Sequence, residues 1–355
     1  MIKNKSIIKT DVIVIGGGPA GMMTAGRAGT RGLSVLLLEK NKTLGKKLLI
    51  TGGGRCNLAN NIPNTRTLLA KYKNSDQFLF SAFSQFGVKD TLQFFKDREL
   101  ATKEEAEGRI FPVSNKAQSV LDALVQYIKK GGVEIMTSAV VADIEADEKT
   151  KEFHIRLKDE TEIIAKSCVI ATGGTSHPET GSTGDGFVWL KNFGHKIIDN
   201  DFALVPIALK DAWAKKLSGV VLSEIRLSIF LNGKKEKKSG NRKGKLLFTH
   251  FGISGPTVLN MSKEVGELLP AGDVVIGLDL FPNIDHGELK KKLQNLLVAE
   301  SNKKIKNALG EIVPSAIVSA LLEIADIDGE TASHSVRSED RKRLVVLMKN
   351  IPLNV

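Results

Sequence analysis

The sequence contains no long apolar segment. Among its 355 residues, no run of about 18 uninterrupted apolar residues occurs, so no membrane span is expected. The N-terminal stretch MIKNKSIIKTDVIVIGGG begins with basic residues, but its apolar run extends for only about four or five residues before the glycines. That run is too short for the core of a signal peptide, and we expect a soluble protein without a membrane partner.

Cysteine is also scarce. Cys56 and Cys168 are the two cysteines, and they form neither a CxxC pair nor a pattern with metal-ligand spacing. A disulfide-stapled fold is therefore excluded, and no metal site is predicted from the cysteines or the histidines. The reducing cytoplasm is the expected location.

Acidic residues are outnumbered by basic ones, which gives a net charge of +11 and an isoelectric point near 9.4. Two basic runs contribute much of the excess, Lys234 to Lys245 (KKEKKSGNRKGK) and Lys290 to Lys306. Neither run contains an aromatic residue that could stack on a base. The sequence favours a solvated hairpin and a solvated helix face over nucleic-acid binding, which remains the alternative.

The composition of the whole chain is typical of a globular protein, with 42% hydrophobic and 26% charged residues. The length favours two domains. Residues 1–200 begin with strands alternating with helices, as in a parallel α/β sheet. Residues 201–345 continue with strands followed by helices, and we expect them to form a domain inserted into the first, with 346–355 starting the return to it.

A phosphate-binding turn follows the first strand. Asp11 to Ile15 reads as a buried strand, and it runs directly into the GxGxxG pattern of Gly16, Gly18 and Gly21 and then a helix. The first glycine makes the tight turn, the second allows the backbone to approach a diphosphate, and the third allows helix and strand to pack closely. The helix N-terminus adds free N–H groups and a positive dipole end.

The next strand ends in an acid. Glu39 lies 18 residues after Gly21, at the end of the strand Ser34 to Glu39. A carboxylate there can accept both hydroxyls of an adenosine ribose and would repel a 2′-phosphate. The strand, helix and acid together predict a dinucleotide site that disfavours NADP.

The same residues and several further strings resemble one family. The chain is similar to the YhiN-like flavoproteins, which include aminoacetone-oxidase-type and bile-acid-reductase-like (BaiN-like) proteins. The resemblance extends over nearly the whole chain. The strings that carry it are GGGPAG, LGKKL from Leu44, TGGGRCN (Thr51 to Asn57), EGRIFP (Glu107 to Pro112), ATGG from Ala171, TGSTGDG from Thr180, and LFTHFGISGP (Leu247 to Pro256).

The resemblance implies a glutathione-reductase-like, Rossmann-type FAD domain with an inserted domain of strands and then helices, and it implies non-covalently bound FAD. The loop Thr51 to Asn57 would follow the diphosphate and the flavin, Val140 and Val141 would contact the adenine, and Thr172 to Gly174 would form a second close turn. Candidate cofactor contacts are Gly16, Gly18, Pro19, Ala20, Gly21, Glu39, Lys40, Lys46, Lys47, Thr51, Gly52, Gly53, Gly54, Arg55, Cys56, Asn57, Val140, Val141, Thr172, Gly173 and Gly174.

Several of these residues have a second interpretation. Arg55 would offset phosphate charge or polarise the flavin, or it would pair with an internal acid. Cys56 has no resolving partner, so a packed small residue is favoured over a redox thiol.

Five candidates outside that set are also ambiguous. Glu107 with Arg109 reads as a structural pair, whereas His250 with Ser254 could contact substrate or stabilise a turn, and His177 could reach the flavin.

The expected activity is that of an FAD-dependent oxidoreductase. A hydride would pass between NAD(P)H, or another reduced small molecule, and an acceptor such as a conjugated ketone. No catalytic residue is assigned. Family members continue beyond Val355 into a segment that contacts the flavin, and that segment is missing here. The alternative is therefore a catalytically impaired or truncated flavoprotein that acts as a basic nucleic-acid-binding protein.

Overall fold

The computed structural model describes residues 7–62, 64–198, 203–235 and 242–355. The chain divides into two compact units, Met1–Ile198 and Asp199–Val355. Part of the basic run from Lys234 to Lys245 lies outside the described residues. No helix within the described ranges is long and apolar enough to cross a membrane.

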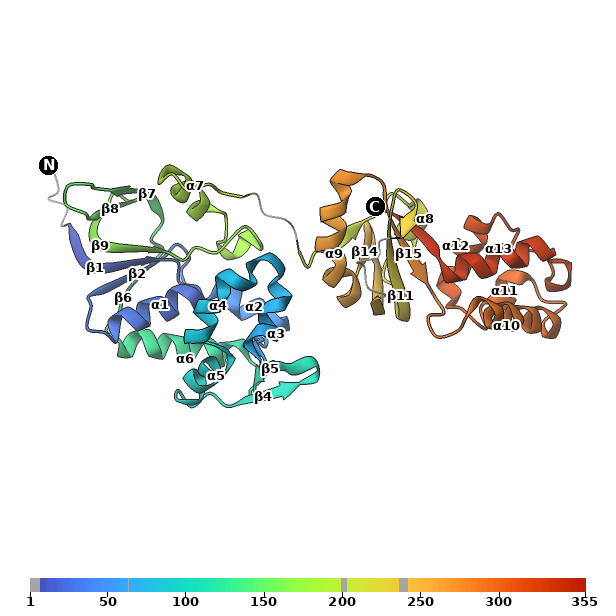
Figure 1. Ribbon diagram of the computed structural model, residues 1–355, viewed down its shortest axis with the longest axis horizontal. Coiled ribbons are helices and arrows are strands. Elements are labelled where there is room, and N and C mark those ends of the chain that lie inside the picture. The colour runs from blue at the N-terminus through green and yellow to red at the C-terminus, as the bar shows by residue number, and fades with distance from the viewer. Residues whose placement is uncertain (1–6, 63, 199–202, 236–241) are drawn as a thin grey trace. The chain divides into compact units, whose positions relative to one another are not determined.

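The first unit is built on a six-stranded sheet (Figure 1). Its strands, in spatial order, are β6 (Glu134–Thr137), β2 (Val35–Glu39), β1 (Ile8–Ile15), β9 (Glu162–Ile170), β8 (Phe153–Leu157) and β7 (Val141–Ala146). The first four strands are parallel, and β8 and β7 continue the sheet antiparallel. The carboxyl ends of β1, β2 and β9 therefore meet at one edge, where an α/β sheet of this kind binds its ligands.

The two faces of this sheet carry separate cores. Alternate residues of a strand point to opposite faces, so Val12 and Val14 of β1 pack in the core that includes Met22 of α1 (Pro19–Gly29). Ile13 belongs to the other core, together with Trp189 of α7 (Asp185–Asn192). Because both faces are covered, β1 and β2 are apolar throughout their central residues, which is the pattern that predicts a parallel sheet.

The remaining elements of the first unit lie between β2 and β7 or after β9. The helices are α2 (Lys46–Ile50), α3 (Thr65–Leu69), α4 (Asp76–Gln85), α5 (Val88–Lys96) and α6 (Ala117–Lys130), with short 3₁₀ turns at Thr51–Gly54, Ala70–Ser75, Ala106–Gly108 and Pro178–Thr180. A small antiparallel sheet has the order β3 (Ala59–Asn60), β5 (Arg109–Pro112) and β4 (Thr102–Glu105). The helix α6 packs against α1 beneath the large sheet.

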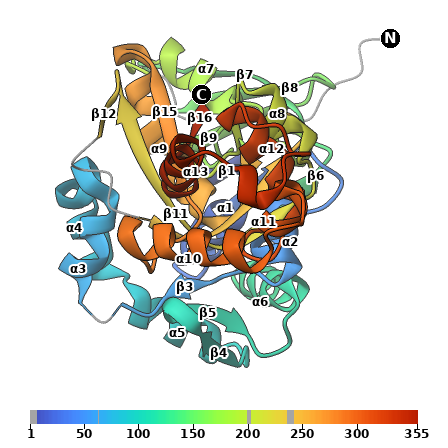
Figure 2. The ribbon, with the colours of Figure 1, turned by 90° about the vertical axis from the view of Figure 1, so that its right-hand side faces the viewer.

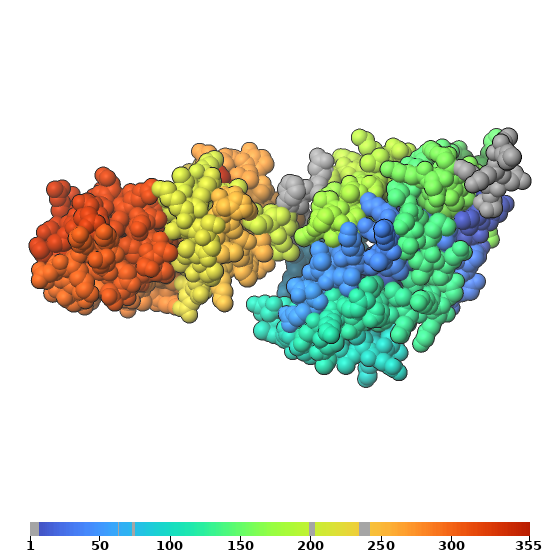
Figure 3. Space-filling model, turned by 180° about the vertical axis from the view of Figure 1, so that it is seen from behind, coloured from blue at the N-terminus to red at the C-terminus, as the bar shows by residue number. Residues whose placement is uncertain are grey.

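The second unit pairs an antiparallel sheet with helices (Figure 2). Its strands, in spatial order, are β10 (Ile207–Ala208), β14 (Gly252–Ser254), β13 (Arg242–Thr249), β11 (Val221–Leu231), β15 (Val274–Asp279) and β16 (Ile351–Asn354), and β12 (Lys234–Lys235) pairs with β11. The helices are α8 (Ala212–Lys216), α9 (Pro256–Leu268), α10 (His286–Ala299), α11 (Ile305–Leu309), α12 (Ser315–Ala325) and α13 (Ser338–Lys349), with 3₁₀ turns at Leu269–Ala271 and Ser333–Ser335. The helices α10 to α13 form one continuous surface beside the strands (Figure 3).

The C-terminal segment belongs to this second sheet. The strand β16 pairs antiparallel with β15, and Ile351 and Leu353 are fully buried in the core of the second unit. This placement corrects the expectation that residues 346–355 begin a return to the first unit. The physical reason is the alternation of Ile351 and Leu353, which gives an edge strand an apolar face to bury.

Candidate dinucleotide-binding site

The three glycines of the first turn have different surroundings. Gly16 has φ +114°, and a Cβ there would meet the carbonyl oxygen of Ala171 at 2.4 Å. A Cβ on Gly21 would meet the carbonyl oxygen of Gly16 at 1.8 Å. Gly18 has φ −77°, which any residue adopts, and a Cβ there would meet nothing within 4 Å. Neither backbone conformation nor packing requires glycine at position 18, so its bare backbone leaves space for a ligand.

A cavity of about 350 Å³ adjoins this turn. Its size is in the range of small-molecule sites, and it lies at the carboxyl ends of β1, β2 and β9. Of the candidate contacts, the cavity is lined by Gly16, Gly18, Pro19, Ala20, Glu39, Lys40, Lys46, Lys47, Val140, Val141, Thr172 and Gly173. The helix α1 begins at Pro19 with no acidic residue in its first turn, so its positive dipole end faces the cavity unopposed.

The carboxylate of Glu39 is buried at the cavity, with 8% of the residue exposed. Its Oε2 accepts a hydrogen bond from the Gly17 N–H at 2.8 Å, and its Oε1 accepts from both the backbone N–H and the side-chain amide of Asn41 at 2.7 Å. A carboxylate has about four acceptor positions, so Oε2 retains one. In this geometry Glu39 can accept a hydrogen bond from one ribose hydroxyl, whereas the sequence predicted two. Accepting the second would require the Asn41 amide to move.

Three lysines connect the cavity wall to the segment 176–185. The Lys47 ammonium donates to the Ser182 hydroxyl at 2.6 Å, and the Lys46 ammonium donates to the Glu179 carbonyl at 2.7 Å. These hydrogen-bond partners are neutral, and the charges of both lysines lie beside the cavity, as a diphosphate would require.

The third lysine is neutralised. Lys40 forms an ion pair with Asp185 at 2.7 Å. Burial opposes ionisation of this carboxyl, but hydrogen bonds from Lys40 and Thr183 hold the pKa of Asp185 below its ordinary value. Lys40 therefore fixes the wall of the cavity and adds no free charge for a phosphate.

The loop Thr51 to Asn57 does not line this cavity, and neither do Gly21 and Gly174. The Arg55 guanidinium donates to both carboxylate oxygens of Glu105 at 2.9 and 3.1 Å, and it lies 4.0 Å from the centre of the Phe111 ring. The hydrogen bonds from Lys103 and Arg55 hold the pKa of Glu105 below its usual value. The structure therefore pairs Arg55 with an internal acid, Glu105, which was the second of its two interpretations from sequence.

Both cysteines are packed thiols. Burial raises the pKa of Cys56, against the smaller opposing effect of a hydrogen bond with Thr51. Burial also raises the pKa of Cys168 to about 11. Neither cysteine is in a disulfide, and a raised pKa disfavours the reactive thiolate.

Four other ambiguous residues contact side chains one or two positions away in the sequence. His177 pairs with Glu179 at 2.8 Å, and Glu107 lies 3.8 Å from Arg109 in an exposed pair. In the second unit, His250 packs edge-on against the Phe251 ring.

Ser254 lies in β14 opposite Leu247.

Among the described residues, no group of three or more His, Cys, Asp or Glu side chains could hold a metal ion.

Several lining residues were not predicted as contacts. They are Ile15, Leu38, Asn41, Gly45, Ala139, Ala171, Thr180, Gly181, Ser182, Asp185 and Trp189. The string TGSTGDG, which starts at Thr180, was noted as part of the resemblance and was the available signal for four of them. Asn41 follows Glu39 by two residues, but its position beside the carboxylate depends on the turn after β2.

Comparison with known proteins identifies the class. Residues 10–326 match the model of the family described as HI0933-like protein Rossmann domain, and the chain belongs to this family. The Rossmann-type domain of this family is the fold that the sequence predicted.

The chain is also similar to individual known proteins. The chain is 30% identical over 319 residues to a ribosomal RNA dihydrouridine synthase of Escherichia coli K12, covering 89% of this chain and 74% of that protein. It is 29% identical over 318 residues to a 3-dehydro-bile acid delta(4,6)-reductase of Clostridium scindens, covering 88% and 75%. A solved 3-ketosteroid-delta4-(5alpha)-dehydrogenase of Rhodococcus jostii RHA1 aligns with 14% identity and a TM-score of 0.48, covering 78% and 68%.

The residues of the cavity suit the adenosine diphosphate part of FAD. The open backbone at Gly18, the first turn of α1 and the positive charges of Lys46 and Lys47 suit a diphosphate. The remaining acceptor on Glu39 suits a ribose hydroxyl.

Proposed function

We propose that this protein reduces a carbon–carbon double bond conjugated to a carbonyl group, with NAD(P)H as the electron donor. The observation that carries the proposal is the cavity at Gly18, whose open backbone, helix N-terminus and buried carboxylate are arranged for a dinucleotide. We further propose that the cavity residues named above hold the FAD, with Gly18, Lys46 and Lys47 at the diphosphate and Glu39 at the ribose.

The names of two relatives favour this acceptor class. One forms dihydrouridine in ribosomal RNA, and the other reduces a delta(4,6) bile acid. Uracil and a 3-oxo-4,6-diene share one feature, an alkene polarised by a conjugated carbonyl. Reduction adds a hydride to the carbon distant from the carbonyl and a proton to the nearer carbon, while NAD(P)H becomes NAD(P)⁺. When bound, FAD supplies the hydride-transfer chemistry.

The chain's own contribution is to bind and orient the cofactor. Lys46 and Lys47 place two positive charges beside the cavity, and Glu39 selects an unphosphorylated ribose. Burial raises the pKa of both cysteines, which disfavours the thiolate that a dithiol relay would need. Two free thiols also suit a reducing cytoplasmic location, which we propose as the site of this activity.

The test uses the purified full chain under anaerobic conditions. We expect the absorption bands of an oxidised flavin and their bleaching on addition of NADPH or NADH. Two acceptors are then compared, an RNA hairpin with unpaired uridines and a steroid with a conjugated ketone. A gain of two hydrogen atoms in either acceptor, detected by mass spectrometry, supports the proposal. Bleaching without reduction of any conjugated acceptor would overturn it, and a colourless protein would favour the nucleic-acid-binding alternative.

A further inference from the structure

A basic cleft lies between two helices of the second unit, α10 and α13. It has a volume of about 210 Å³, and Lys290, Arg341 and Lys342 line it. Leu293 and Val345 also line it and are almost completely buried. The cleft therefore has an apolar floor and three long cationic side chains around it.

None of these three cations forms an ion pair within the described residues. No carboxylate lines the cleft. In the first turn of α13, Asp340 accepts a hydrogen bond from Arg343, and Glu339 is outside the cleft lining. The positive charge of the cleft is thus uncompensated, and three like charges held together favour an anion.

The lysines farther along the same basic run behave differently. Lys303 pairs with Glu300 at 2.8 Å. Lys304 and Lys306 both pair with Glu330, and their hydrogen bonds lower the pKa of Glu330 to about 2. These three lysines are solvent-exposed, as a solvated face requires, and each is paired with a nearby acid. Lys290 differs because α13 brings two further cations beside it.

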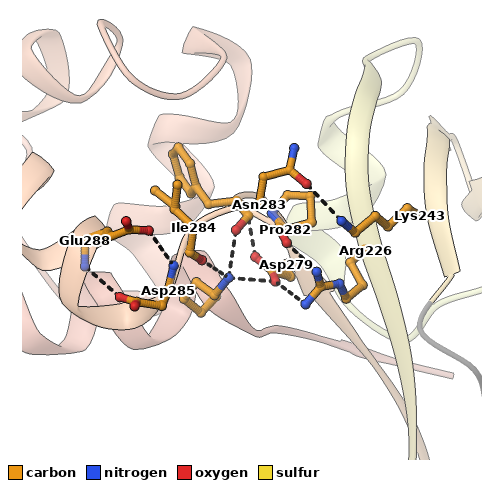
Figure 4. A network of polar contacts seen from close by, with 10 residues as sticks. Arg226, Lys243, Asp279, Pro282, Asn283, Ile284, Asp285 and Glu288 are labelled. Carbon is orange, nitrogen blue, oxygen red and sulfur yellow. Dashed lines mark hydrogen bonds and ion pairs between the residues drawn. The ribbon is translucent and has the colours of Figure 1, made fainter.

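A polar network fixes the helices on either side of the cleft (Figure 4). At the end of α13, the Lys349 ammonium donates to the Asp279 carboxylate at 2.8 Å and to the Ile284 carbonyl at 2.9 Å, just before α10 begins. The first turn of α10 is closed by reciprocal hydrogen bonds between Asp285 and Glu288. The network therefore fixes the two helices that carry the three cations.

We propose that this cleft binds the phosphodiester backbone of RNA and so docks an RNA substrate on the second unit. The inference rests on the proposed function, with uridine in RNA as the acceptor. Arg341 can contact a phosphate with two parallel N–H groups, while Lys290 and Lys342 act as point charges. No aromatic residue lines the cleft, so recognition is of the backbone and independent of base sequence. A recessed cleft also suits a strand better than the flat surface of a membrane.

The test measures binding in the flavin-loaded full chain, without turnover. The probe is a fluorescein-labelled RNA hairpin with unpaired uridines, titrated by anisotropy at several salt concentrations. The triple variant Lys290→Gln, Arg341→Gln, Lys342→Gln is expected to weaken binding about 10- to 100-fold near 0.1 M salt and to reduce the slope of log Kd against log salt by about two. The matched control is Lys210→Gln, Lys215→Gln, Lys245→Gln, which removes the same charge from three exposed and unpaired positions of the second unit.

The outcomes separate this inference from the proposed function. Flavin content and anaerobic reduction by NADPH should be unchanged in both triple variants. A failure of the reductase proposal would therefore already be detected with the unsubstituted chain, without the variants. Equal weakening by both variants would overturn the cleft, since only net charge would then matter. RNA would be overturned as the ligand if the cleft variant lost binding to phosphatidylserine vesicles but bound RNA as before. The absence of RNA binding by the unsubstituted chain would overturn it as well.

Discussion

Two glycine-rich segments of the first unit look alike in sequence and differ in structure. The turn Gly16 to Gly21 lines the cavity, whereas the loop Thr51 to Asn57 does not. Gly52, Gly53 and Gly54 all have positive φ, between 56° and 82°. In that loop, glycine serves the backbone conformation, because L side chains are strained in the left-handed region.

The first turn uses glycine for a second reason. Gly18 has an ordinary φ of −77° and no neighbour in reach of a Cβ. Its missing side chain makes room for something outside the chain. A glycine with ordinary backbone angles and open space is therefore a sharper sign of a ligand than three glycines that only turn the chain.

The largest expected effect follows from filling that space. Gly18→Val should fold normally and raise the Kd for FAD at least about 100-fold, because the side chain and the diphosphate compete for the same volume. The control is Gly53→Asn, since asparagine tolerates left-handed angles and Gly53 also has open space around it. Fluorescence titration of the apoprotein with FAD measures both. Equal loss of affinity in the two variants would erase the distinction between the segments.

The second test compares the carboxylates that contact the two segments, Glu39 beside Gly17 and Glu105 beside Arg55. Glu39→Gln should raise the Kd for FAD about 10- to 100-fold and lower the free energy of unfolding by about 1–3 kcal/mol, because the amide replaces one acceptor of backbone N–H groups with a donor. Glu105→Gln, which loosens the pair with Arg55, should change the Kd less than about twofold. A larger effect at Glu105 than at Glu39 would place the cofactor along the other loop.

The third test concerns the cysteines. A raised pKa means less thiolate at a given pH, so Cys168, with a pKa of about 11 against 9.0 for an unperturbed thiol, should be alkylated by iodoacetamide about 100-fold more slowly than in urea at pH 8. Its rate should rise about tenfold per pH unit until the pH approaches 11. Cys56 should also react slowly, since burial raises its pKa. Mass spectrometry of labelled peptides separates the two sites, and rapid labelling of Cys56 at neutral pH would revive the redox interpretation.

The sequence alone determined the first strand, the turn and the acid on the second strand. These features depend on neighbours in the chain: a β-branched apolar run, three glycines at fixed spacing, and Glu39 at a strand end. It also predicted the family and a second part of strands followed by helices.

Tertiary structure decided the partners of the charged groups. Whether Arg55 faces a phosphate or Glu105, and whether a lysine is free like Lys290 or paired like Lys304, depends on residues that are far away in sequence. The edge strand at Ile351–Asn354 likewise became visible only when β15 was placed beside it. Local patterns fix backbone geometry because its energies are local, whereas a charge takes whichever partner the fold brings within a few ångströms.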